Sequence, residues 1–331
     1  MLAYILRRLA YMVLTLILVS IVCFYLINLP PGSFIETFAT QLDASGSPAS
    51  AAQLAYLTTR YGLDQPLYLQ YLNWIVPLVT QGDWGYSFEW QQPVWNLVSE
   101  RLWLTVAVSL FSVLFVYAVS IPVALYSATH QYSAGDYTVS LFGIIGLATP
   151  NFLLALVLLV FSARFFGVTP TGLFSPEYIT APWNGDKIRD LLWHLPVPVI
   201  VVGLAGTAAT IRILRSQLLD EFQKQYVVTA RAKGVPERRL ILKYPFRIAL
   251  NPIVSTIGHL LPEIVSGSTI VGIVLGLPTI GPLLLRAIIA QDTYLAASCL
   301  LLLGVLTVLG VVVSDILLTL LDPRLRMSRA N

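Results

Sequence analysis

Very few side chains could do chemistry inside the apolar stretches of this sequence. Glu263 follows a proline in one such stretch, Asp315 lies in the last one, and Asn151 follows a proline near the middle of another. A carboxylate in hydrocarbon is unfavourable by about 2.5–3.5 kcal/mol on insertion scales, so it should face protein or a water-filled path. Glu263 and Asn151 are therefore candidates for lining a solute path, where Glu263 could meet a cationic group. A structural hydrogen bond from Glu263 to a neighbouring helix or subunit is an equal alternative. Asp315 is expected to hold the C-terminal segment in place.

The sequence lacks the common signatures of an enzyme. It contains no G-x-x-x-x-G-K-[ST] phosphate loop, because Lys233-Gly234 has the reverse order, and no H-E-x-x-H or G-x-S-x-G. Cys23 and Cys299 each lie in an apolar run, as small buried hydrophobic residues do. The three histidines are far apart. We therefore expect no catalytic residue, no metal and no cofactor on this chain.

Composition indicates an integral membrane protein. Of the 331 residues, 56% are hydrophobic and 11% are charged, which does not describe a soluble core. The formal net charge of +3 is too small to predict nucleic-acid binding, so the positions of the charges matter more than their sum.

Six apolar stretches are long enough to cross a bilayer as helices. The first follows Arg7 and Arg8 and has no small-residue cleavage site after it, which favours an uncleaved span over a secretory signal. Pro122 interrupts the second, and Pro150 places a kink near the middle of the third. The expected spans are 9–29, 102–129, 137–166, 196–211, 252–277 and 294–321.

Basic residues are distributed unevenly between the two sides that these spans define. Most of the 20 lie at the N-terminus, at the C-terminus or in the polar stretch between the fourth and fifth spans. The positive-inside rule then places both termini and that stretch in the cytoplasm.

The polar stretch Asp220–Asn251, here called the basic segment, has its own pattern. Tyr226, Val227 and Ala230 follow Phe222 at the spacing of one helical face. Gly234 is a candidate for the left-handed residue that ends the helix, and a second helix should start near Pro236. One interpretation is a basic loop that binds lipid phosphates. Its basic residues are Lys224, Arg231, Lys233, Arg238, Arg239, Lys243 and Arg247.

A resemblance favours a more specific interpretation of the basic segment. The run Tyr226-Val-Val-Thr-Ala-Arg-Ala-Lys-Gly234, with Arg247, Ala249 and Leu250 after it, resembles the cytoplasmic "EAA" loop of permease subunits from ABC importers. The oligopeptide/dipeptide/nickel permease branch is the most similar. The general family has an acidic residue where this chain has Val228, so no carboxylate can act at that position.

The resemblance extends along most of the chain. The runs 61–67 and 82–88, with Tyr71-Leu72 between them, resemble the extracytoplasmic insert of the same family. An aromatic-rich cap at the membrane interface would give a similar composition. Leu277-Pro-Thr-Ile-Gly281 partly matches a family turn, and the matches continue at Arg286, Gln291-Asp292 and Ser314-Asp315, with Asp322-Pro-Arg324 near the end.

The resemblance implies an all-α integral membrane protein with six transmembrane helices. It divides the chain into a cytoplasmic N-terminus with the first helix (1–29), an extracytoplasmic insert (30–100) and a permease core (101–331) with a coupling loop at 212–251. In the family this loop forms a coupling helix that docks on an ATP-hydrolysing subunit. The residues carried over are Glu221, Tyr226, Val227, Thr229, Ala230, Arg231, Ala232, Lys233 and Gly234.

The same resemblance implies how the protein would work. Two related permeases would form the pore in the bacterial cytoplasmic membrane, two ABC ATPases would use ATP and Mg, and an extracytoplasmic binding protein would deliver peptides. ATP hydrolysis would belong to the partner subunits. Nickel complexes or oligosaccharides are alternative substrates, and an ion-coupled secondary transporter or a membrane scaffold is an alternative class. The sequence has no convincing internal repeat, which counts mildly against the ion-coupled transporter.

Overall fold

The computed structural model describes residues 2–29, 65–167 and 170–321. Most of them are helical, and the chain divides into two compact units. Unit 1 contains the described residues of 1–105 and 279–308, and unit 2 contains those of 106–278 and 309–321. Expectations that concern 30–64 and 322–331 lie outside the described residues.

Unit 1 is assembled from segments far apart in the sequence. It contains α1 (Leu2–Ile27), α4 (Leu67–Gln81), the two-residue strands β1 (Tyr86–Ser87) and β2 (Gln92–Pro93), and α13 (Ile280–Ile289). The strands pair antiparallel, with Tyr86 opposite Pro93. The first turns of α5 (Val94–Thr129) and most of α14 (Thr293–Leu321) complete it.

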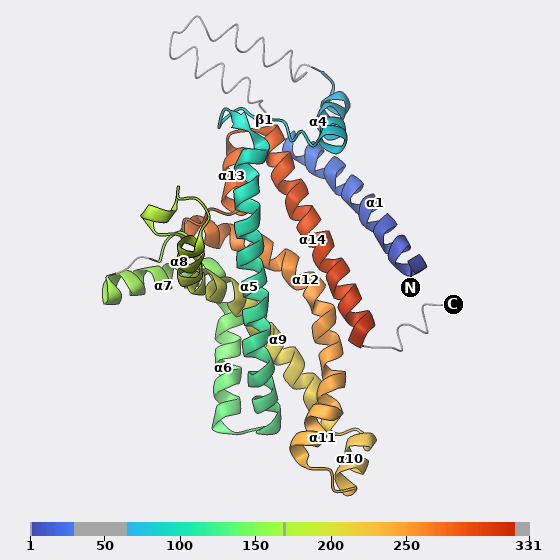
Figure 1. The fold of residues 1–331 in the computed structure, drawn as a ribbon. Helices are drawn as coiled ribbons and strands as arrows, with labels where there is room; N and C mark the ends of the chain where they lie inside the picture. The colour runs from blue at the N-terminus through green and yellow to red at the C-terminus, as the bar shows by residue number, and fades with distance from the viewer. Residues whose placement is uncertain (1, 30–64, 168–169, 322–331) are drawn as a thin grey trace, which may run out of the picture. The chain divides into compact units, whose positions relative to one another are not determined.

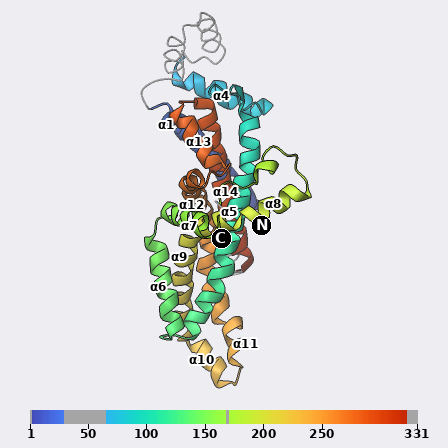
Figure 2. The ribbon, with the colours of Figure 1, turned by 90° about the vertical axis from the view of Figure 1, so that its left-hand side faces the viewer.

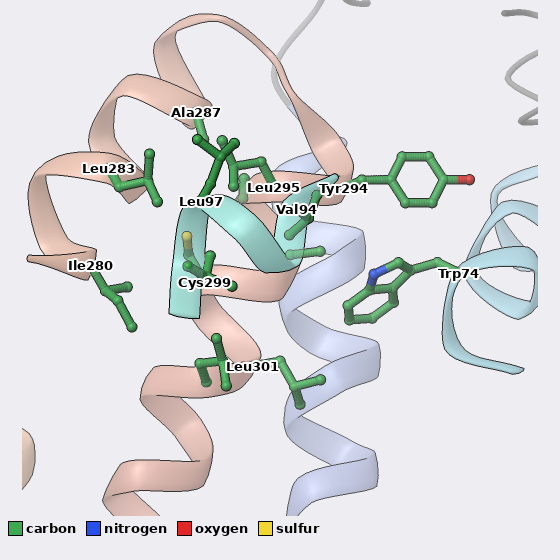
Figure 3. Close-up of a cluster of buried hydrophobic side chains, with 14 of the residues drawn as sticks. Trp74, Val94, Leu97, Ile280, Leu283, Ala287, Tyr294, Leu295, Cys299 and Leu301 are labelled. Atoms are coloured by element: carbon green, nitrogen blue, oxygen red, sulfur yellow. The ribbon is translucent and has the colours of Figure 1, made fainter. Parts of the chain in front are cut away.

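The core of unit 1 lies where these helices meet. Val94 and Leu97 from α5, Leu283 and Ala287 from α13, and Leu295 from α14 point toward one another (Figure 3). All five side chains are buried. The short helix α13 was not expected; its side chains Ile280, Leu283 and Ala287 are buried in this core.

Unit 2 holds the rest of α5 and the helices α6 to α12. Their bounds are α6 (Ala134–Ala148), α7 (Asn151–Phe166), α8 (Gly185–His194), α9 (Pro196–Phe222), α10 (Gln225–Ala232), α11 (Glu237–Lys243) and α12 (Pro245–Val274), with a 3₁₀ turn at Pro176–Tyr178. Helix α9 packs against α6, α7 and α12. The α5–α6 turn and the α10–α11 pair lie at the same end of this unit (Figures 1 and 2).

Four helices of the described chain are long and apolar enough to cross a membrane, or five if one bent pair counts as a single span. The four are Ala10–Ile27, α5, α9 and Thr293–Val313. Two are longer than expected, because α5 starts at Val94 and continues through Pro122 without a break, and α9 continues to Phe222. The expected fifth span (252–277) starts within α12 and extends past its end at Val274; the side chains of α12 at 254–263, 265 and 266 are not among those described.

The expected third span is not one kinked helix. Helices α6 and α7 are separated at Thr149-Pro150 and bent by 104°. Pro150 explains the break, because its ring disfavours the helical region at Thr149, whose ψ is 120°. This stretch is therefore a broken span or a re-entrant pair.

Gly203 of α9 allows this helix to approach α5 closely. A Cβ added there would lie 2.9 Å from Cδ1 of Phe115 in α5. Ser268, Gly272 and Gly276 are spaced four residues apart, but only the first two lie in α12, because Gly276 follows the helix with φ +63° and turns the chain.

Candidate functional site

Between α9 and α12 the basic segment contains two short helices, as the sequence predicts. Helix α9 ends at Phe222, α10 covers Gln225–Ala232, and α11 covers Glu237–Lys243 before α12 begins. Glu221 therefore belongs to α9, not to the helix that carries Tyr226. In Figure 1 the pair α10–α11 lies at the end of unit 2 where α9 ends and α12 begins.

Gly234 ends α10 with a specific hydrogen-bond pattern. Its φ is +74°, its N–H donates to the carbonyl of Arg231, and the N–H of Val235 donates to the carbonyl of Ala230. This is a Schellman motif, in which a left-handed residue satisfies the last carbonyls of a helix. A Cβ at Gly234 would meet nothing within 4 Å, so backbone conformation rather than space favours glycine here.

A small core holds α10 against α11. Val227 and Ala230 from α10 and Leu240 from α11 are buried together. Burial of a side chain such as Val227 contributes about 1.5–3 kcal/mol. Arg231 donates to Glu237 at 2.6 Å, which holds the pKa of that carboxyl below its usual range. Both partners of this pair are about half exposed, so it adds at most about 1 kcal/mol. Apolar packing therefore dominates.

The remaining expected residues of α10 face outward. Tyr226, Thr229 and Ala232 are exposed, as are Arg231, Lys233 and Gly234. The hydroxyl of Tyr226 donates to the Glu221 carboxylate, which joins α10 back to α9. The seven basic side chains of the segment are all exposed. The structure thus separates Val227 and Ala230, which support the segment, from its outer face.

An ion pair between the buried Asp136 and the partly exposed Arg215 could not be predicted from the sequence. Arg215 of α9 donates through Nε and Nη2 to the two oxygens of Asp136 at 2.9 and 2.7 Å. Ser127 of α5 also donates to Asp136, and the backbone N–H of Tyr132 donates to it at 3.0 Å. The cluster, here called the Asp136 clamp, ties α5, α6 and α9 together. The one sequence signal was an Asp three residues after Ser133, which caps α6.

Apolar packing joins the clamp to the two ends of the basic segment. Leu214 and Leu218 of α9 are buried with Ala249 and Ile253 of α12, and Phe222 packs against this group. The last turns of α9 and the first turns of α12 therefore form one packed body next to α10 and α11.

The two path candidates belong to neighbouring helices. Asn151 at the start of α7 is half-buried, and its Nδ2 lies 3.6 Å from the position of a Cβ on Gly267 in α12. Glu263 lies one helical turn before Gly267, on the same side of α12 by spacing. Its side chain is outside the described part of the chain. Asp315 lies in α14 and is half-buried.

In unit 1 the structure joins two of the motif segments noted above. The Ser87 hydroxyl donates to Oδ2 of Asp292 at 2.6 Å, across 205 residues, and the N–H of Glu89 donates to the same oxygen. Asp292 also caps α14 by accepting from the N–H of Leu295. Burial raises the pKa of the Asp292 carboxyl, and these donors oppose that shift. Its fixed position next to Gly85–Phe88 could not be read from the sequence.

Models of two related families match the chain. The "Binding-protein-dependent transport system inner membrane component" matches residues 120–327, and the N-terminal component of the same kind of system matches 1–109. The chain belongs to this permease family. The matched region includes the basic segment, the Asp136 clamp and both path candidates.

Curated relatives align with the permease over nearly its whole length. The oligopeptide transport system permease protein AppB of Bacillus subtilis is 33% identical, with 98% of this chain and 99% of AppB covered. The inner membrane ABC transporter permease protein YejB of Escherichia coli O157:H7 is 31% identical, with 98% of each chain covered.

A solved structure has a similar fold. A chain from inward-facing conformations of the MetNI methionine ABC transporter matches with a TM-score of 0.55 and 18% identity. The match covers 68% of the permease and 96% of that chain. At this identity the likeness concerns the fold alone.

Proposed function

We propose that this permease is one of two membrane subunits of an ABC importer for peptides. The observation that carries the proposal is the full-length similarity to AppB, whose name gives an oligopeptide transport system. OppB of Haemophilus influenzae, also named for oligopeptide transport, is 29% identical over 98% of this chain. These names favour peptides over nickel complexes or oligosaccharides.

The outer face of α10 is the proposed docking surface for an ABC ATPase. Tyr226, Thr229 and Ala232 are exposed on it, and Arg231, Lys233 and Gly234 continue it. A short helix with its own apolar core and a fixed end moves as one body, whereas a loop would absorb the displacement. The chain has no phosphate loop of its own, so ATP and Mg would act on the partner subunits.

The Asp136 clamp and the packing around Phe222 are the proposed route from the docking surface into the membrane. Movement of α10 would pull on the end of α9 through Tyr226 and Glu221. Because Arg215 fixes α9 to α5 and α6, those helices would move together. A pore between two permeases could then switch between inward- and outward-facing states.

Asn151 and Glu263 are the proposed path residues. Support comes from the position of Asn151 against α12, one turn from Glu263. Glu263→Gln keeps the shape of the side chain and removes its charge. We expect this variant to assemble normally and to take up peptides with a free amino terminus more slowly in proteoliposomes. Unchanged uptake would leave Glu263 with a structural role only.

We also propose where each part of the chain lies relative to the membrane. Residues 30–100 would form the extracytoplasmic insert, and 101–331 the permease core in the bacterial inner membrane. Both termini and the basic segment would lie in the cytoplasm, as the basic residues suggest. A binding protein would deliver peptides to the insert.

Affinity purification of the tagged protein from native membranes tests the proposal. We expect a second permease of the same family and ABC ATPases to co-purify. ATP-dependent peptide uptake should then be reconstituted from these chains and the binding protein. A permease that purifies alone, or uptake driven by an ion gradient without an ATPase, would refute it.

A further inference from the structure

Helix α8 turns its polar side toward the protein. Lys187 is only 2% exposed; its Nζ donates to the carbonyl of Ala181 at 2.7 Å and lies 5.1 Å from the ring centres of Phe174 and Trp183. On the same side, Asp190 accepts from the N–H and the hydroxyl of Ser175, both at 2.7 Å. These buried polar groups are satisfied, so the orientation of the helix is well determined.

Apolar side chains of α8 point outward instead. Ile188 and Leu192 are each 50% exposed, and Trp193 is 82% exposed. Ile179 and Trp183, just before α8, are also exposed. A helix on a protein surface in water normally has the opposite arrangement. Transfer of apolar side chains from water to an apolar environment is favourable, so this face fits an apolar environment better than water.

The position of α8 in the chain identifies that environment. Only Leu195 separates the end of α8 from α9, one of the helices that can cross a membrane. Helix α8 must therefore lie at the depth where α9 enters the bilayer. Its 10 residues extend about 15 Å, too short to cross a hydrocarbon core of about 30 Å. A short helix at this depth can lie along the surface of the membrane.

The order of side chains around α8 matches the layers of a membrane surface. Ile188 and Leu192 are one turn apart and form an apolar row. Arg189 and Trp193 form the next row, and long basic and indole side chains prefer the headgroup level. Asp186 lies beyond them and is exposed. This order of environments around the helix, from hydrocarbon through headgroups to water, is that of an interfacial helix.

We propose that α8 lies in the membrane interface, with Ile188 and Leu192 in the acyl chains of one leaflet and Arg189 and Trp193 among the headgroups. Lipid would thereby fix the depth of the first turn of α9. The loop before α8 shares this anchor through Asp190 and Ser175, and the N–H of Gly172 donates to the carbonyl of Leu275 after α12 at 2.7 Å. The membrane surface would then hold the ends of two helices of unit 2.

Spin labels on single cysteines at 188, 192 and 186 test this arrangement in phosphatidylcholine–phosphatidylglycerol nanodiscs. Cys23 and Cys299 are first replaced by alanine, and the label on 186 is the matched control from the same helix. We expect labels at 188 and 192 to collide more with oxygen than with a water-soluble nickel chelate, and the label at 186 to show the reverse. Preferential collision of 188 and 192 with the nickel chelate would place this face in water and overturn the proposal.

A photo-crosslinking amino acid at position 188 tests the same face in the intact complex and leaves the native cysteines unchanged. Ile188→benzoylphenylalanine should give adducts with lipid and no larger polypeptide product after illumination of whole cells. A crosslink to another protein chain, or shielding of labels at 188 and 192 from both collision reagents, would assign the face to a protein partner and refute the lipid assignment.

Discussion

At the scale of single residues, the left-handed conformation of Gly234 determines where α10 ends. The Schellman bonds to Arg231 and Ala230 depend on that conformation. Any other L-residue there is strained, by about 1–2 kcal/mol in general and by more for a β-branched one. Asparagine adopts this conformation more readily than other non-glycine residues.

Gly234→Val is expected to uncouple ATP hydrolysis from transport, because the end of α10 and the start of α11 would shift together. We expect the number of peptides imported per ATP hydrolysed to fall at least several-fold in proteoliposomes, with membrane insertion unchanged. Gly234→Asn is the control and should retain most of the coupling. Equal ratios in the valine variant and the unmodified chain would contradict the proposed role of α10.

At the scale of helices, glycines decide how closely α9 can pack. Gly203 faces Phe115 and the carbonyl of Ser112 in α5, whereas Gly143 of α6 has open space around it. Both lie within helices, where alanine is intrinsically favoured over glycine by about 0.5–1 kcal/mol.

These two glycines should respond oppositely to alanine. Gly143→Ala should raise the melting temperature slightly through the helix preference alone. Gly203→Ala should lower it, because its Cβ would lie 2.9 Å from Phe115 and overpacking is unfavourable by about 1–3 kcal/mol. Thermal unfolding in one detergent compares them. Stabilisation of both variants would show that α5 and α9 are not tightly packed at this level.

The Asp136 clamp connects three helices and should be sensitive to the loss of one partner. Asp136→Asn leaves Arg215, whose side chain is 26% exposed, without a counter-charge, so we expect a loss smaller than the roughly 3–5 kcal/mol typical of a fully buried pair. In the double variant Asp136→Asn/Arg215→Gln the unpaired charge is gone, so part of that loss should be recovered. Melting temperatures of the unmodified protein, of Asp136→Asn, of Arg215→Gln and of the double variant give the coupling between the two residues. Strictly additive changes in stability would show that Asp136 and Arg215 do not stabilise each other.

At the scale of the whole molecule, a hydrogen bond joins two segments that are far apart in the sequence. Ser87 and Asp292 are 205 residues apart, and their hydrogen bond lies beside the core of unit 1. The ring of Phe88 also contacts that of Tyr294, with centres 5.9 Å apart. Residues 87–89 are therefore held against the start of α14 by these contacts.

Ser87→Ala removes one donor from the buried Asp292 carboxylate, which we expect to destabilise unit 1 by about 1–3 kcal/mol. Burial raises the pKa of Asp292 in the folded state, so folding favours the protonated form, and the stability gained from protonation is lost as pH rises. The hydrogen bond from Ser87 stabilises the charged form and so opposes this loss. The destabilisation by Ser87→Ala should therefore be larger at neutral pH than below the usual carboxyl pKa of about 4. Protease cleavage within 65–100 measures it, and Thr80→Ala is the exposed control. A defect that does not change with pH would contradict the charged state of Asp292.

Much of the fold could be predicted from the sequence because its signals are local. Hydropathy over about 20 residues located long apolar helices at residues 10–27, in α5, in α9 and in α14. Gly234 marked the end of a helix, because the left-handed conformation is a property of one residue and its neighbours. Pro150 marked the disturbance in the third apolar stretch, although not the size of the bend.

Tertiary structure alone decided which residues meet and which way each helix faces. Asp136 and Arg215 are 79 residues apart, and nothing local distinguishes them from other charges at helix ends. Val227 and Ala230 became the core of the basic segment because Leu240 packs against them. In α8 the polar side turned inward because Ala181 and Ser175 offer hydrogen bonds there. The sequence by itself determined a multi-pass membrane protein and the approximate positions of its long apolar helices, since these depend on short-range hydropathy and backbone preference. The contacts that join the helices depend on partners distant in the chain, which only packing brings together.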